Sequence, residues 1–149
     1  MKKSALVGAL VAVAVCAVSL AALGSAKNPV SRPFQYHGVA TGVINLADGT
    51  WTMSEVGEGT HLGRITNTGS GTGWGAVATG VVTTANRDQI FWVQPGSSWP
   101  IEFTSGTGRF VGCTGGFKTV EWKVVSDTYP DSKTEVLVVA YTAAGTIAY

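Results

Sequence analysis

Polar and apolar side chains alternate at every step along Thr119-Val120-Glu121-Trp122-Lys123-Val124. Because successive side chains of a strand point to opposite faces, this alternation predicts a strand with one buried face and one wet face, as in an antiparallel sheet. The same pattern runs through Trp99-Pro100-Ile101-Glu102-Phe103-Thr104. In contrast, Val136-Leu137-Val138-Val139-Ala140-Tyr141 is apolar on both faces. It predicts either a central strand or a strand whose outer face meets another subunit.

Short runs of Val, Thr and aromatic residues recur along the chain, separated by Gly, Asp, Asn or Pro. The β-branched residues suit a pleated sheet and glycine suits turns and bulges, whereas no window after residue 26 has the apolar period of a capped helix. We expect nine strands, at 34–45, 50–57, 60–68, 75–84, 88–94, 99–104, 116–126, 134–142 and 145–149. Asp48-Gly49 predicts a tight hairpin turn between the first two.

Eight or nine strands at this spacing are typical of a sandwich or a small closed barrel. Glycines inside the expected strands favour the barrel, where tight bends need them; examples are Gly38, Gly42, Gly63 and Gly80. We therefore predict an all-β fold, a small antiparallel eight-stranded β-barrel over residues 34–149. The glycine-rich stretch 69–75 is expected to be a mobile hairpin loop, because it lacks the ending of a phosphate-binding loop and no helix follows it.

The N-terminus has the pattern of a secretory signal peptide. Two lysines open the chain, residues 5–23 carry no charge, and Gly24-Ser25-Ala26 places small residues at the exit. We expect residues 1–26 to be a signal peptide, cleaved after Ala26, and residues 27–33 to be a short linker. The protein would then be exported, to the periplasm, the cell envelope or the outside. A retained membrane anchor and a lipoprotein at Cys16 are the alternatives, and no stable membrane span is expected in the mature chain.

Charged residues make up only 13% of the chain, and the formal net charge is +1, which becomes −1 once Lys2 and Lys3 are removed. No basic stripe is available to bind nucleic acid. Loss of Cys16 leaves Cys113 alone, which excludes an intramolecular disulfide, and it is either a small buried residue or an exposed thiol. His37, His61 and Cys113 form no short ligand pair, so neither a metal site nor a cofactor is expected.

Five tryptophans in so short a chain either plug the barrel or line an apolar cavity. We take as candidate ligand-binding residues two tryptophans, a histidine and two of the scarce arginines: His61, Arg64, Trp92, Arg109 and Trp122. A second set is expected to shape turns and anchor the fold: Gly63, Asp88, Gly106, Gly108, Phe110 and Gly112. Phe110 is expected to point inward while Arg109 points to the opposite side. There Arg109 either pairs with a carboxylate such as Asp88, which is the favoured role, or faces a ligand cavity.

Three motifs stand in order: Thr60-His61-Leu62-Gly63-Arg64-Ile65-Thr66, Ala85-Asn86-Arg87-Asp88-Gln89-Ile90 and the stretch 105–115 that contains Gly106-Thr107-Gly108-Arg109-Phe110. Together they resemble a group of bacterial secreted proteins, and the last resembles the dirigent and allene oxide cyclase barrels. The resemblance implies an eight-stranded barrel of lipocalin-like architecture with a central cavity, and a homo-oligomer, trimeric in the plant relatives.

The chain departs from that group at Arg87, Ser105 and Cys113, where the group tends to have Gly, Gly and Ala. Arg87 in place of glycine argues against a strict need for positive φ at this turn. No catalytic residue of the cyclases or dirigent proteins can be matched to this chain, so the resemblance carries no activity over.

Three functions remain open from the sequence. The first is a non-catalytic exported barrel that binds a small, mostly apolar molecule or serves a structural role. The second is an isomerase or cyclase whose barrel steers a reactive intermediate, a role that a polar charge pointing into the cavity would favour. The third is an integral outer-membrane barrel, suggested by the alternation of Gly145, Ile147 and Tyr149. Glu121 and Lys123 argue against this third function, because they leave no clean lipid-facing band on their strand.

Overall fold

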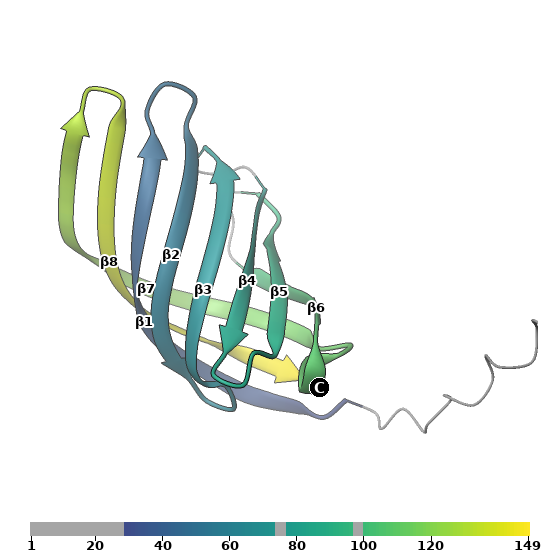
Figure 1. Ribbon diagram of the computed structural model, residues 1–149. Coiled ribbons are helices and arrows are strands. Elements are labelled where there is room, and N and C mark those ends of the chain that lie inside the picture. The colour runs from purple at the N-terminus through teal and green to yellow at the C-terminus, as the bar shows by residue number, and fades with distance from the viewer. Residues whose placement is uncertain (1–28, 74–76, 97–99) are drawn as a thin grey trace, which may run out of the picture.

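The computed structural model describes residues 29–73, 77–96 and 100–149. Eight strands form a closed barrel in chain order, and each is antiparallel to its neighbours (Figure 1). The strands are β1 (Ser31–Asn45), β2 (Thr50–Gly59), β3 (Gly63–Thr72), β4 (Ala78–Thr84), β5 (Gln89–Gln94), β6 (Ile101–Gly106), β7 (Thr114–Asp131) and β8 (Thr134–Ala148). Within these ranges the only helical segment is a single 3-10 turn, η1 (Gly108–Phe110). The prediction of an all-β, eight-stranded antiparallel barrel is confirmed.

The two strands expected at the C-terminus are one continuous strand, β8. Gly145 does not interrupt it, because the glycine allows a close approach: a Cβ there would lie 2.9 Å from the Cα of Phe117 on β7. At the other end of the chain β1 begins at Ser31, which pairs with Ala148. Residues 31–33, expected to be part of a linker, therefore belong to the strand that closes the barrel.

The expectation of a loop at 69–75 is wrong for its first four residues, because Gly69–Thr72 form the end of β3. Tryptophan rings explain the glycines there. A Cβ on Gly69 would lie 2.7 Å from Cζ2 of Trp92, and a Cβ on Gly71 would lie 2.8 Å from Cζ2 of Trp51. These glycines therefore make room for rings that lie against the barrel wall. Residues 74–76, and with them Trp74, lie outside the described residues.

Four aromatic rings pack against one another inside the barrel and are here named the aromatic plug: Phe34, Tyr36, Phe103 and Phe117. The Phe34 and Phe117 rings stack with centroids 5.4 Å apart, and Phe103 meets Phe117 edge-on at 5.5 Å. Such offset and edge-to-face contacts add to the stabilisation from buried area. Because Phe34 and Tyr36 define the inner face of β1, the intervening residues of that strand point outward.

The motif around η1 has the arrangement predicted from the sequence. Phe110 is fully buried, and the side chain of Arg109 lies outside with Nε 3.7 Å from Oδ2 of Asp88. Gly108 has φ +56°, and a Cβ there would overlap the Asp88 carboxylate. The inference drawn from Arg87 is wrong: Arg87 has φ +69°, so this turn does use the left-handed region, and arginine occupies it in place of glycine.

The barrel is closed at only one end of β7. β6 pairs with β7 from Ile101↔Phe117 to Phe103↔Gly115, and no further pairs join them among the described residues. Beyond Phe117, β7 and β8 continue with β1 and β2 as a projecting sheet, whose two hairpins rise above β4, β5 and β6 in Figure 1. The even positions of 119–124 do face inward, but they are not buried: Trp122 is 59% exposed, because within the described ranges β6 pairs with β7 only as far as Phe117.

Candidate functional site

Five polar or amphipathic side chains meet on the inner wall of the barrel, beside the aromatic plug. We name Tyr36, Glu55, Asn67, Trp92 and Tyr141 the interior polar cluster. Glu55 and Asn67 are buried although most charged and amide side chains in proteins are exposed. Buried polar groups of this kind need hydrogen-bond partners inside the protein.

Hydrogen bonds link the members of the cluster in a chain. Trp92 Nε1 donates to Asn67 Oδ1 at 2.8 Å, and Asn67 Nδ2 donates to Glu55 Oε2 at 2.8 Å. The hydroxyl of Tyr36 donates to the other carboxyl oxygen, Oε1. Every buried side-chain nitrogen and oxygen in the described part of the chain has a partner. The network is thus fully satisfied, which is the condition for such a group to be tolerated inside a core.

The position of Glu55 follows from the register of β2. Trp51, Met53 and Glu55 share the inner face, and Glu55 stands between Ala40 on β1 and Asn67 on β3. Gly38 supplies the space: a Cβ there would lie 2.8 Å from Glu55 Oε1. The small residue and the acid are therefore matched to one another across neighbouring strands.

Burial shifts the titration of the whole cluster. Desolvation raises the pKa of Glu55, and hydrogen bonds from Tyr141, Tyr36 and Asn67 only partly oppose that rise. Desolvation, with the charge of Glu55 as a second cause, also raises the pKa of Tyr36 and of Tyr141 far above the ordinary phenol value. Both tyrosines stay neutral, and Glu55 keeps its proton to a higher pH than an exposed glutamate does.

Apolar side chains continue the inner wall from the cluster toward the projecting end. We name this surface the upper concave face; its residues share the inner register and are only partly covered: Met53, Val120, Trp122, Val124, Val139 and Tyr141. Trp122 lies directly opposite Tyr141 in the ladder, and Val124 opposite Val139. The result is an apolar wall that ends at a few polar groups, which is the usual composition of a small-molecule site.

Two hollows lie toward the outside of the projecting sheet. One, of about 680 Å³, crosses β2, β1, β8 and β7, and its lining includes His37, Val39, Val56 and Lys123. The other, of about 620 Å³, lies where the β1–β2 and β7–β8 turns meet, beside Asn45. Both are shallow and open, so neither encloses a molecule.

The structure brings two of the five predicted ligand-binding residues near the interior. Trp92 belongs to the interior polar cluster, and Trp122 lies on the upper concave face. Of the two roles expected for the tryptophans, Trp92 takes the first and plugs the core, whereas Trp122 lies on an open face and not in an enclosed cavity. Trp99 lies outside the described residues.

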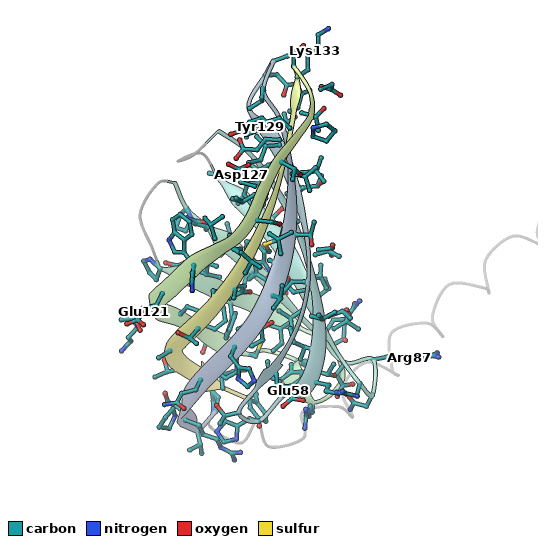
Figure 2. The ribbon with its side chains drawn as sticks, turned by 90° about the vertical axis from the view of Figure 1, so that its left-hand side faces the viewer. Glu58, Arg87, Glu121, Asp127, Tyr129 and Lys133 are labelled. Atoms are coloured by element: carbon teal, nitrogen blue, oxygen red, sulfur yellow. The ribbon has the colours of Figure 1, made fainter. Side chains whose placement is uncertain are left out.

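The other three predicted residues lie on the outside and do not meet. His61 is in the β2–β3 turn with φ +70°, where Nε2 is 3.2 Å from the carbonyl oxygen of Pro33. Arg64 faces Glu58 at 3.6 Å. Arg109 lies at η1. Figure 2 shows Glu58 and Arg87 at the end of the molecule away from Lys133, which marks the tip of the projecting sheet.

No group of three metal-ligating side chains occurs among the described residues. Cys113 is buried and unpaired, and burial raises the pKa of its thiol, which makes it a poor nucleophile at neutral pH. Within the three described ranges no helix is long and apolar enough to cross a membrane. Residues 1–26, the expected signal peptide, lie outside those ranges.

Reasoning from the sequence missed four of the five cluster residues: Tyr36, Glu55, Asn67 and Tyr141. One signal was present. Along Trp51-Thr52-Met53-Ser54-Glu55, the acid falls in phase with Trp51 and Met53, so period-two counting places it on the buried face. Nothing in the sequence indicates that Asn67 and Tyr36 would reach it, because that contact depends on the register between strands.

We compared the chain with protein-family models, curated proteins and solved structures, and nothing matches it in any of the three. The resemblance to the bacterial secreted group and to the dirigent and allene oxide cyclase barrels therefore stays a prediction that rests on the three sequence motifs.

Proposed function

We propose that this chain is an exported barrel protein that binds one small, mostly apolar molecule against the upper concave face. The observation that carries the proposal is the exposure of large apolar side chains on an inner face. Trp122 and Val124 share the register of the buried core, yet both are open to solvent. Exposed apolar surface of this kind, next to a few convergent polar groups, is the ordinary composition of a ligand site.

The interior polar cluster supports one end of such a site. Tyr141 is only partly buried and lies where the apolar wall meets the aromatic plug, so it is the member of the cluster placed to contact a single polar group of the ligand. The phenol of Tyr141 stays neutral, so its hydroxyl can share a hydrogen bond with a carbonyl or hydroxyl oxygen of the ligand. The expected ligand is therefore an apolar body with one oxygen-bearing end.

Two neighbouring valines of β8 test the location of the site. Val139 faces the concave side and Val138 faces the outside, and both are half-buried. The probe is 1-anilinonaphthalene-8-sulfonate, whose fluorescence rises in an apolar site. We expect Val139→Asp and the space-filling Val139→Phe to weaken probe binding about tenfold or more, and Val138→Asp to leave it near the wild-type value.

The opposite result, loss of binding in Val138→Asp alone, would move the site to the outer face. Native mass spectrometry of the protein purified from its own host adds an independent measurement, because it reports the mass of a retained ligand and the position of signal-peptide cleavage. Circular dichroism of each variant checks that the sheet is kept.

An isomerase or cyclase is a second candidate, and one observation favours it: Glu55 is an acidic side chain that points into the barrel. A buried acid with a raised pKa is a common proton donor or acceptor in enzymes. If the retained ligand proves to be a substrate, Glu55→Gln would keep its binding and lose its conversion. Equal conversion by wild type and Glu55→Gln would remove this candidate.

A further inference from the structure

β7 has a long free edge. Beyond Phe117 it pairs with β8 only, as far as the described residues go, and every residue from Glu121 to Lys133 is exposed. Figure 2 follows this strand from Glu121 on the flank through Asp127 and Tyr129 toward the tip at Lys133. A strand edge of this length presents a row of backbone N–H and C=O groups, which is a template for pairing with another strand.

Register shifts between β7 and β8 limit the part of this edge that can pair with another strand. The register with β8 shifts between Phe117 and Thr119, and again between Val124 and Ser126. A third shift follows between Thr128 and Asp131, around Pro130, which cannot donate a backbone hydrogen bond. Bulges bend a strand and disrupt its ladder, so they protect the outer part of β7 from unwanted pairing. The segment 119–124 is left as the regular part of the free edge.

We propose that a second copy of this chain pairs antiparallel with segment 119–124, centred on Trp122. In a two-fold pairing of identical strands, residues at equal distances on either side of the centre face each other. With Trp122 opposite Trp122, Glu121 of each copy faces Lys123 of the other, and Val120 faces Val124. Opposite charges thus meet twice across one interface.

The charged side chains favour this register over the two registers shifted by one residue. Moving the centre by one residue toward the N-terminus places Glu121 opposite Glu121, and moving it by one toward the C-terminus places Lys123 opposite Lys123. Like charges directly opposite each other in an antiparallel pair are destabilising. The pairing also covers apolar surface, because Trp122 and Val124 lie on one face and are exposed in the single chain. Since the regular segment is short, the dimer is expected to be weak and to depend on concentration.

Charge reversal tests the register. Sedimentation equilibrium of the purified protein over a range of concentrations measures the dimer dissociation constant. Glu121→Lys and Lys123→Glu each replace two attractive contacts by two repulsive ones, so each should weaken the dimer about tenfold or more. The double variant Glu121→Lys/Lys123→Glu restores the attraction and should return the constant to near the wild-type value. Asp127→Lys, which lies on the same strand outside the segment, is the matched control and should change little.

A disulfide test does not depend on the charged variants. Cα atoms of directly opposite residues in an antiparallel pair are close enough for a disulfide, so Trp122→Cys should form a covalent dimer under mild oxidation. Tyr129→Cys should not, and wild type supplies the background from the native cysteines. The proposal fails if wild type is monomeric at every concentration, if the single reversals leave the dimer unchanged, if the double variant does not recover, or if Tyr129→Cys cross-links as readily as Trp122→Cys.

Discussion

Phe117 and Trp122 lie on the same strand and point to the same side of the sheet, yet Phe117 is 8% exposed and Trp122 is 59% exposed. The difference comes from the neighbouring strand. Among the described residues, β6 pairs with β7 beside Phe117, but this pairing does not reach Trp122. The barrel is therefore closed at Phe117 and open at Trp122. Alternation in a sequence therefore predicts the direction of a side chain, whereas its burial depends on how far the neighbouring strands extend.

The largest difference in stability is expected between a substitution in the aromatic plug and one on the projecting sheet. Phe34 is fully buried between Phe103 and Phe117, so Phe34→Ala leaves a cavity and should lower the free energy of unfolding by about 3–5 kcal/mol. Tyr129 is an aromatic of similar size on the projecting strand and is exposed, so Tyr129→Ala should cost less than about 1 kcal/mol. Urea unfolding followed by circular dichroism measures both. Equal losses would contradict this difference.

Two glycines of β1 should differ by a smaller amount. A Cβ on Gly38 would lie 2.8 Å from Glu55 Oε1 and 2.9 Å from the carbonyl oxygen of Val56, so Gly38→Ala should cost about 1–3 kcal/mol. Gly42, on the same face of the same strand, has ordinary room: its nearest atoms would be at 3.8 and 3.9 Å. Gly42→Ala should be neutral or slightly stabilising, because alanine loses less backbone conformational entropy than glycine when the strand folds. Thermal melts compare the two, and a large loss in Gly42→Ala would argue against this register.

The interior polar cluster should make stability depend on pH. The folded pKa of Glu55 lies above its ordinary value of 4.5, so the folded protein holds this proton to higher pH than the unfolded chain does. Its stabilising contribution is full below about pH 4.5 and is lost as the pH rises through the folded pKa, by at most about 1.4 kcal/mol per pH unit. Glu55→Gln should lack this fall. Unfolding free energies measured from pH 4 to 8 compare the variant with wild type, and parallel curves would refute the assignment.

The smallest expected effects belong to the two surface ion pairs. Arg109 and Asp88 have side chains 43% and 19% exposed, whereas Arg64 and Glu58 are 87% and 57% exposed. Double-mutant cycles to alanine should give a coupling of about 0.5–1 kcal/mol for the first pair and about 0.2 kcal/mol or less for the second. A zero coupling for Arg109 and Asp88 would remove the scaffold role of Arg109 and leave it as a candidate for binding.

Sequence patterns predicted what depends on local chemistry. Val and Thr runs located the strands, Asp48-Gly49 located a turn, and Gly106-Thr107-Gly108 placed Phe110 inside. Features that depend on contacts between distant strands were not predicted. The glycines of β3 look like a loop until the rings of Trp51 and Trp92 are placed beside them. Positive φ at Arg87 is set by the surrounding turn, which outweighs the preference of the residue itself.

The same holds for the candidate site: some of its residues could be predicted from the sequence, but the contacts between them could not. Tryptophans stood out by their number alone, and Trp92 and Trp122 do lie near the interior. Glu55 carries a sequence signal in its phase, but its partners Tyr36 and Asn67 are 19 and 12 residues away, on neighbouring strands. Only the cross-strand register makes them neighbours, and that register is set by the packing of the whole core.

Closure of the barrel by β1 and β8 has a consequence for the order of folding. Ser31 pairs with Ala148 and Asn45 pairs with Thr134, so the first strand is joined along its length to the last. Contacts of such long sequence separation carry a large loop-closure entropy and form slowly. The ladder cannot be completed before the final strand has left the ribosome. Until then β2 to β6 can pair with their neighbours, but the barrel itself stays open.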